Sequence, residues 1–153
     1  MPYDRLVKQG RIKAYSAHPR EIQQLLQVAA RDLEVAIRNL NDTPDWAYSI
    51  AYNAVLQAGR ALMMSEGYRA RGGEQHATVV AFVEEKLGAS HVTDIHLFDQ
   101  MRRKRHRVIY EVAGLISKTE AGQAITFAKE FVYKIAEIIM GHIGLGISDE
   151  QVS

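Results

Sequence analysis

Lys or Arg occupies five of the six positions from 102 to 107, and His106 is the sixth residue. Across the whole chain, 19 Lys and Arg nearly balance 18 Asp and Glu, so the excess of positive charge is local. Crowded cations repel one another unless anions neutralise them, and a polyphosphate backbone supplies such anions. We therefore expect this segment to bind RNA or nucleotide phosphates, with a solvated basic helix face as the ordinary alternative. The residues assigned to this contact are Arg102, Arg103, Lys104 and Arg107.

Arg105 stands where the helical pattern predicts a buried apolar residue. Apolar residues recur at helical spacing on both sides of it: Phe98, Met101, Val108, Val112 and Leu115. A guanidinium keeps its charge and is costly to bury without a partner. We expect Arg105 either to pair with a carboxylate or to lie in a cleft that receives a phosphate. The carboxylates considered for such a pair are Asp32, Glu34 and Glu66.

Two side chains near Arg105 have groups suited to proton transfer or hydrogen bonding. The imidazole of His106 can act as a general base near neutral pH. Tyr110 is a poor base at that pH, but its hydroxyl can donate a hydrogen bond. We therefore treat Arg105, His106 and Tyr110 as candidate catalytic residues. An exposed histidine and a tyrosine at a helix seam are the ordinary alternatives.

A glycine-containing loop leads to His76 at the expected start of another helix. Backbone amides at a helix start attract anions, and Arg69 and Arg71 add positive charge nearby. His76 is therefore a further candidate for nucleic-acid binding. His91 and His96 are five positions apart, which does not suit one helix face. We expect no metal site and no cofactor.

Length and composition indicate one domain with a full hydrophobic core. The chain has 153 residues, of which 47% are hydrophobic and 24% are charged, and it has no cysteine. We expect a single domain over residues 1–153, in which residues 1–18 form an N-terminal arm. The first residues include no apolar signal segment, and the most apolar stretch, near 135–147, is too short to span a bilayer. These features predict a cytoplasmic protein without membrane contact.

Apolar residues recur at helical spacing through nearly the whole chain, and proline or glycine separates the helical segments. This pattern predicts an all-α fold, an up-and-down antiparallel bundle of about five helices. No segment shows the alternation of a strand. The expected helices cover residues 19–41, 45–66, 74–87, 93–116 and 119–141.

Three segments together resemble the HEPN family, helical-bundle proteins of prokaryotes found beside minimal nucleotidyltransferases. They are DWAYSIAYNA (residues 45–54), GYRARGGEQH (67–76) and RRKRHRVIYE (102–111). The resemblance covers nearly the whole chain and implies a HEPN-like bundle that forms a homodimer. It also implies that in active members two motifs face each other across the dyad and cleave RNA without metal. The signature of these members is an Arg followed four to six residues later by a His, with a polar residue directly after the Arg.

The sequence departs from this signature at one position. Arg105 matches the Arg and His106 the polar residue, but Tyr110 stands where the His is expected. Loss of a general base lowers a rate by about 10² to 10⁴. We therefore expect a catalytically weak or inactive HEPN domain that binds RNA or nucleotide phosphates at a basic dimer cleft. The resemblance implies a nucleotidyltransferase partner in a toxin–antitoxin or defence system.

Two alternative functions remain open from the sequence. One is an active metal-independent endoribonuclease that uses Arg105 with His106 or Tyr110. The other is a non-catalytic helical interaction scaffold, in which Arg105 ties the bundle together or binds an acidic partner.

Overall fold

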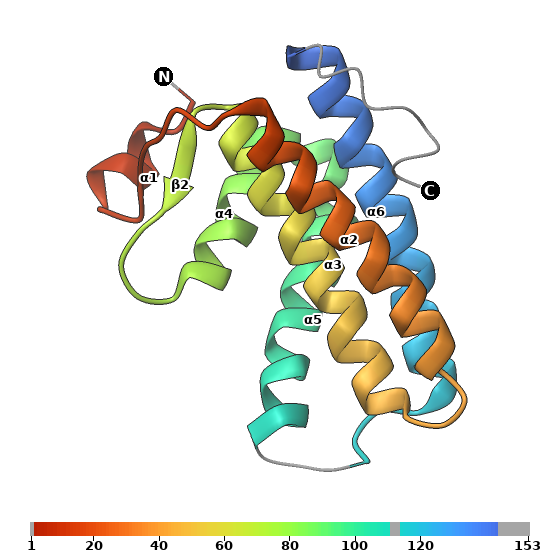
Figure 1. The fold of residues 1–153 in the computed structure, drawn as a ribbon. Coiled ribbons are helices and arrows are strands. Elements are labelled where there is room, and N and C mark those ends of the chain that lie inside the picture. Colours follow the sequence, from red (N-terminus) through yellow and green to blue (C-terminus); the bar gives the residue numbers. More distant parts are fainter. Residues whose placement is uncertain (1, 111–113, 144–153) are drawn as a thin grey trace.

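The computed structural model describes residues 2–110 and 114–143, with the backbone alone for residues 142 and 143. Helices dominate this part of the chain, which confirms the all-α fold class (Figure 1). The five predicted helices all begin within one residue of their expected starts. The helices are α1 (Asp4–Lys8), α2 (Pro19–Asn39), α3 (Pro44–Ser65), α4 (Gln75–Leu87), α5 (Val92–Tyr110) and α6 (Lys118–Ile143).

The helix that contains the basic segment does not reach its predicted end. The sequence pattern indicated residues 93–116, but the described part of α5 runs to Tyr110, and residues 114–116 are not helical. Gly114 has a φ of 73°, a left-handed conformation that does not continue a helix. The apolar pattern continued past the helix end because Leu115 and Ile116 also pack against the core. Val112 of the predicted stripe lies outside the described residues.

The arm and one loop contain two short strands that the sequence analysis did not predict. β1 (Ile12–Ala14) pairs antiparallel with β2 (Tyr68–Ala70), and Ile12 is opposite Ala70. A short 3-10 turn, η1 (Ala89–His91), precedes α5. Strands of three residues are too short to show a period of two, so sequence periodicity does not detect them. The strand pair holds the arm against the loop that leads into α4.

The central helix of the bundle is α3, which packs against α2, α4, α5 and α6 (Figure 1). Small residues on α3 permit this close approach. A Cβ atom added to Gly59 would lie 2.5 Å from Cγ1 of Val79 on α4. The position of α4, which begins beside His76, therefore depends on the absence of a side chain at Gly59.

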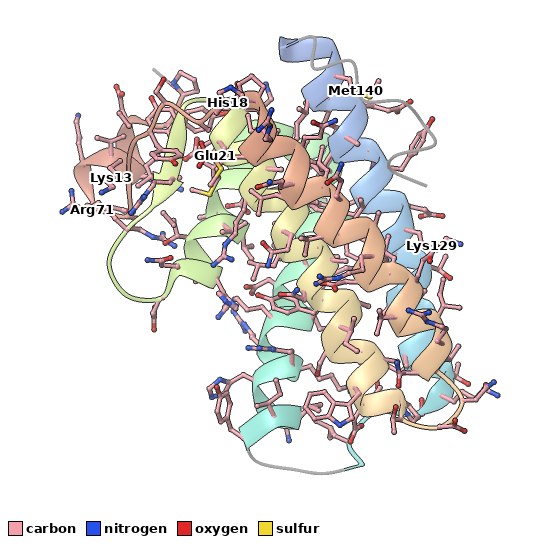
Figure 2. The ribbon with its side chains drawn as sticks, viewed as in Figure 1. Lys13, His18, Glu21, Arg71, Lys129 and Met140 are labelled. Carbon is pink, nitrogen blue, oxygen red and sulfur yellow. The ribbon has the colours of Figure 1, made fainter. Side chains whose placement is uncertain are left out.

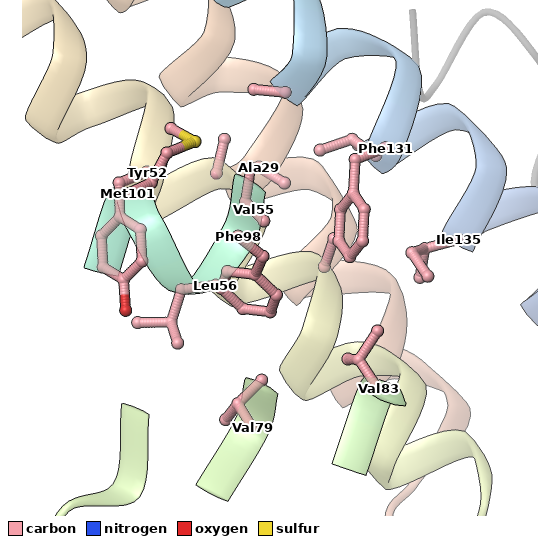
Figure 3. Close-up of a cluster of buried hydrophobic side chains, with 14 of the residues drawn as sticks. Ala29, Tyr52, Val55, Leu56, Val79, Val83, Phe98, Met101, Phe131 and Ile135 are labelled. Atoms are coloured by element: carbon pink, nitrogen blue, oxygen red, sulfur yellow. The ribbon is translucent and has the colours of Figure 1, made fainter. Parts of the chain in front are cut away.

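An apolar cluster fixes α5 between α4 and α6. Figure 3 shows Phe98 of α5 beside Val79 and Val83 of α4 and near Phe131 of α6. The ring centroids of Phe98 and Phe131 are 5.6 Å apart, and both side chains are buried. Burial of Phe98 in this cluster sets the position of α5, and so places the residues one and two turns after Phe98.

Candidate functional site

Arg105 lies against an aromatic ring from α3. Its guanidinium carbon Cζ is 5.9 Å from the centroid of the Tyr52 ring, within the range of a cation–π contact. Tyr52 is buried, with 1% of its surface exposed, whereas Arg105 is half-buried. The half-buried position agrees with the apolar stripe that predicted it. The ring supports the guanidinium from one side without neutralising its charge.

No carboxylate among the described residues forms an ion pair with Arg105. The three acidic residues considered from the sequence have other contacts or lie elsewhere. Asp32 accepts hydrogen bonds from Arg31 and Asn53. Glu66 pairs with Lys86, and Glu34 lines a hollow between α2 and α6. Within residues 2–110 and 114–143, the positive charge of Arg105 therefore lacks a carboxylate counter-ion.

His76 contacts the same tyrosine from α4. Its Nδ1 atom is 3.0 Å from the hydroxyl oxygen of Tyr52, a hydrogen bond whose direction depends on the histidine tautomer. Burial lowers the pKa of His76 below its ordinary value, and the positive charges of Arg60, Arg105 and Arg102 lower it further. Burial raises the pKa of Tyr52, so its hydroxyl stays protonated. Near pH 7 the free protein thus holds a neutral imidazole beside cations.

Arg60 of α3 and Arg102 of α5 complete a group of residues that we call the Arg105 cluster. Arg102 donates to Oδ1 of Asp99 through Nε at 2.9 Å, and 28% of its side chain is exposed. Arg60 has a weak contact of 3.5 Å with Oε1 of Gln57. The cluster consists of Tyr52, Arg60, His76, Arg102 and Arg105. It contains three guanidinium groups, of which one has a carboxylate partner among the described residues.

The remaining basic residues of α5 do not belong to this cluster. Arg103 pairs with Asp99 at 3.0 Å, and 72% of its side chain is exposed. Lys104 pairs with Glu120 of α6. Arg103, Lys104 and Arg107 line a different hollow of about 420 Å³. The structure therefore divides the predicted phosphate surface between two faces of α5.

His106 and Tyr110, predicted as candidate catalytic residues, lie together near the end of α5. Their ring centroids are 4.8 Å apart. Both side chains are exposed, and Tyr110 has 68% of its surface accessible. Within the described part of the chain, neither ring contacts Tyr52 or His76. The histidine that shares an environment with Arg105 is His76, from another helix.

A polar chain between α2 and α3 reaches one member of the cluster. Asn53 donates to Oδ2 of Asp32 at 2.6 Å, and Gln57 donates to Oδ1 of Asn53 at 3.2 Å. Gln57 in turn contacts Arg60. Asp32 is buried, and its hydrogen bonds compensate the cost of burying its charge. This chain of polar contacts therefore reaches Arg60 from Asp32 along one side of α3, through a weak last contact.

Comparison with known families places this site in a known domain type. The HEPN domain family matches residues 22–139, which is most of the chain and includes every residue of the Arg105 cluster. The chain is a HEPN-domain protein. No curated protein matches it as a relative. None of the described helices is both long and apolar enough to cross a membrane.

Sequence reasoning missed two residues of this candidate site, Tyr52 and Arg60. Neither lies near the basic segment in the sequence. A signal was present, since Asn53, Gln57 and Arg60 follow one another at steps of four and three on a helix that is otherwise mostly apolar. Polar residues at that spacing indicate a polar face, and Tyr52 borders it.

Proposed function

We propose that this HEPN domain binds phosphate groups of RNA or nucleotides at the Arg105 cluster. The single observation that supports this most is the half-buried guanidinium of Arg105, which lies over the ring of Tyr52 and has no carboxylate partner among the described residues. A permanently charged group in such a place is stabilised by a bound anion. Arg103, Lys104 and Arg107 have a lesser part in this binding, because they line a hollow on another face of α5, where Arg103 pairs with Asp99 and Lys104 with Glu120.

The chemistry of the cluster suits a phosphate with its several oxygens. A guanidinium presents a planar fork of N–H donors that matches phosphate geometry. When the hydroxyl of Tyr52 donates to Nδ1 of His76, the Nε2 atom carries a proton and can donate a further hydrogen bond. Arg105, Arg102 and His76 then offer donors from two helices to one anion.

The proposal is tested by binding of a fluorescently labelled single-stranded RNA. Replacement of both Arg102 and Arg105 by alanine should weaken binding by more than about tenfold, because charge-assisted hydrogen bonds are lost. Fluorescence anisotropy measures the affinity, and circular dichroism melting shows whether the fold is retained. Wild-type affinity in a folded double variant would contradict the proposal.

The oligomeric state and the partner protein are part of the same proposal. We infer that the domain acts as a homodimer and works with a nucleotidyltransferase in a toxin–antitoxin or defence pair, as the family resemblance implies. Light scattering of the purified chain gives its oligomeric state. Co-purification with the product of a neighbouring nucleotidyltransferase gene tests the partner, and a monomer that retains no such partner would contradict this part.

Metal-free cleavage of RNA is a second candidate function, favoured by the place of His76. In the other tautomer of His76, Nδ1–H donates to the hydroxyl oxygen of Tyr52, and Nε2 can accept the proton of a ribose 2′-hydroxyl as that oxygen attacks the adjacent phosphorus. The imidazolium returns this proton to the 5′-oxygen as the bond from phosphorus to that oxygen breaks, and a guanidinium stabilises the charge on the phosphorane. In this scheme His76 takes the place of the histidine that the motif lacks at Tyr110.

Cleavage is tested by incubation of RNA with the protein in EDTA. The expected products carry 2′,3′-cyclic phosphate ends, and both Arg105→Ala and His76→Gln should lower the rate by about 10² or more. His106→Gln is the matched control and should leave the rate unchanged. Intact RNA with the wild-type protein would leave binding as the function.

A further inference from the structure

A third hollow lies beside the Arg105 cluster, bordered by α2, α3 and the segment from β2 to α4. Its volume is about 250 Å³. Four apolar side chains line it: Leu25, Met63, Met64 and Ala70. Methionine sulfur is polarisable and makes favourable contacts with aromatic rings. The apolar part of this lining is therefore suited to a flat, unsaturated group.

The polar part of the lining is suited to the same kind of group. It consists of Arg60, Arg69 and Gln75, and the described residues around the hollow include no carboxylate. Cζ of Arg69 lies 5.3 Å from the centroid of the Tyr15 ring. Gln75 donates through Nε2 to the carbonyl oxygen of Gly72 at 3.2 Å, and its Oε1 is an acceptor. Guanidinium planes stack on nucleobases, and side-chain amides bind base edges.

Two residues connect this hollow to the phosphate site. Arg60 lines the hollow, and its charge also acts on His76 and Tyr52. Gln75 lines the hollow and directly precedes His76 at the start of α4. One small ligand with an anionic end and a planar end can therefore reach both places.

The volume limits what the hollow can hold. Pockets for drug-sized ligands have about 300–1,000 Å³, so 250 Å³ suits one planar ring system better than a whole nucleotide. We propose that the hollow is a base pocket, which holds a nucleobase while the phosphate of the same nucleotide lies at the Arg105 cluster. This inference rests on the proposed function. The base belongs either to a free nucleotide or to a residue of single-stranded RNA.

The test compares adenosine 5′-monophosphate with ribose 5-phosphate, which lacks the base, by calorimetric titration of the full chain. The wild-type protein should bind the nucleotide about fivefold or more tightly, because stacking of one base contributes at least that factor. Arg69→Ala should lower the ratio of the nucleotide affinity to the ribose 5-phosphate affinity. Leu25→Trp, which fills the hollow, should bring this ratio to about one. Ribose 5-phosphate should bind both variants as it binds the wild type. Arg105→Ala should lower the affinity for both ligands by the same factor and so leave the ratio of affinities unchanged.

A short oligoadenylate separates the two sources of the base. If adenosine 5′-monophosphate displaces it from the wild-type protein, the pocket accepts free nucleotides. If the mononucleotide does not bind, but Arg69→Ala and Leu25→Trp both weaken binding of the oligoadenylate, the base that occupies the hollow belongs to RNA. Equal binding of the nucleotide and ribose 5-phosphate, with no effect of either variant on any ligand, overturns the base pocket alone. Failure of all three ligands to bind the wild-type protein overturns the phosphate site as well.

Discussion

At the scale of single residues, Tyr52 connects the two groups on which the proposed function depends. Its ring lies under the guanidinium of Arg105, and its hydroxyl bonds to Nδ1 of His76. Both contacts come from one buried side chain, so the cation and the imidazole have fixed places relative to each other. Phosphate binding needs such preorganisation, because ordering long side chains on binding costs free energy.

Binding of RNA should become tighter as the pH falls from 7.5 towards 5.5. In the free protein the pKa of His76 is lowered by burial and by the neighbouring arginines. A bound phosphate neutralises those arginines and favours the imidazolium, so the complex takes up a proton that the free protein does not hold. Affinity therefore rises as pH falls through the interval between the two pKa values.

Anisotropy titrations at several pH values measure this dependence, and His76→Gln should remove it while keeping a hydrogen-bonding group beside Tyr52. His106→Gln is the matched control and should retain the dependence, because that exposed ring does not contact the cluster. A dependence that survives His76→Gln would show that another group titrates on binding.

At the scale of the elements, the site depends on where α4 and α5 lie against α3. Close contact between α3 and α4 at Gly59 and Val79 brings the start of α4 to Tyr52. The aromatic contact between Phe98 and Phe131 and the ion pair between Lys104 and Glu120 connect α5 to α6. The cluster is thus assembled by helix packing, since its residues come from three helices.

Two glycine-to-alanine changes should have opposite effects on stability. In Gly59→Ala the new Cβ would overlap Cγ1 of Val79, and such overpacking costs about 1–3 kcal/mol. In Gly122→Ala on α6 the nearest atom is Cδ2 of Leu40 at 3.9 Å, so the change should stabilise the helix by up to about 1 kcal/mol. Thermal melting should show a lower midpoint for the first and a higher one for the second. A stabilised Gly59→Ala variant would mean that α4 is not held closely to α3.

Several basic residues lie at the end of the molecule where the arm pairs with the loop before α4. Lys13 and Arg71 lie at the end of the molecule that contains the strand pair, whereas Lys129 lies on α6 (Figure 2). The backbone amide of Arg71 donates to the carbonyl oxygen of Arg11 at 2.9 Å, and Lys13 is opposite Arg69 in the strand pair. The backbone pairing of the arm with the loop before α4 therefore brings four basic residues to one end of the molecule.

At the scale of the whole molecule, the sequence predicted the architecture well because helical periodicity is strong over long segments. The starts of the five long helices follow from residues such as Pro19, and Ser117 caps α6 by accepting a hydrogen bond from the amide of Glu120. The strand pair and the end of α5 were not predictable from local pattern. They depend on the pairing of Ile12 with Ala70 and on Gly114, which are tertiary and backbone features.

The site was predictable only in part, for a physical reason. A charged residue within an apolar stripe identified Arg105 from its own helix. Tyr52 and Arg60 join it through packing between helices, about which the spacing within one segment carries no information. The loop before His76 made this residue a candidate for nucleic-acid binding, but its contact with Tyr52 became evident only from the fold.

The salt dependence of RNA affinity tests the central claim most directly. For single strands, the slope of log affinity against log salt concentration is about 0.7 for each phosphate that a cation neutralises. Loss of Arg105 as a phosphate contact should therefore make the slope shallower by about 0.7 in Arg105→Ala. Arg103→Ala, on the same helix but paired with Asp99, should leave it nearly unchanged. A slope in Arg105→Ala equal to that of the wild type would contradict the claim that this guanidinium binds a phosphate.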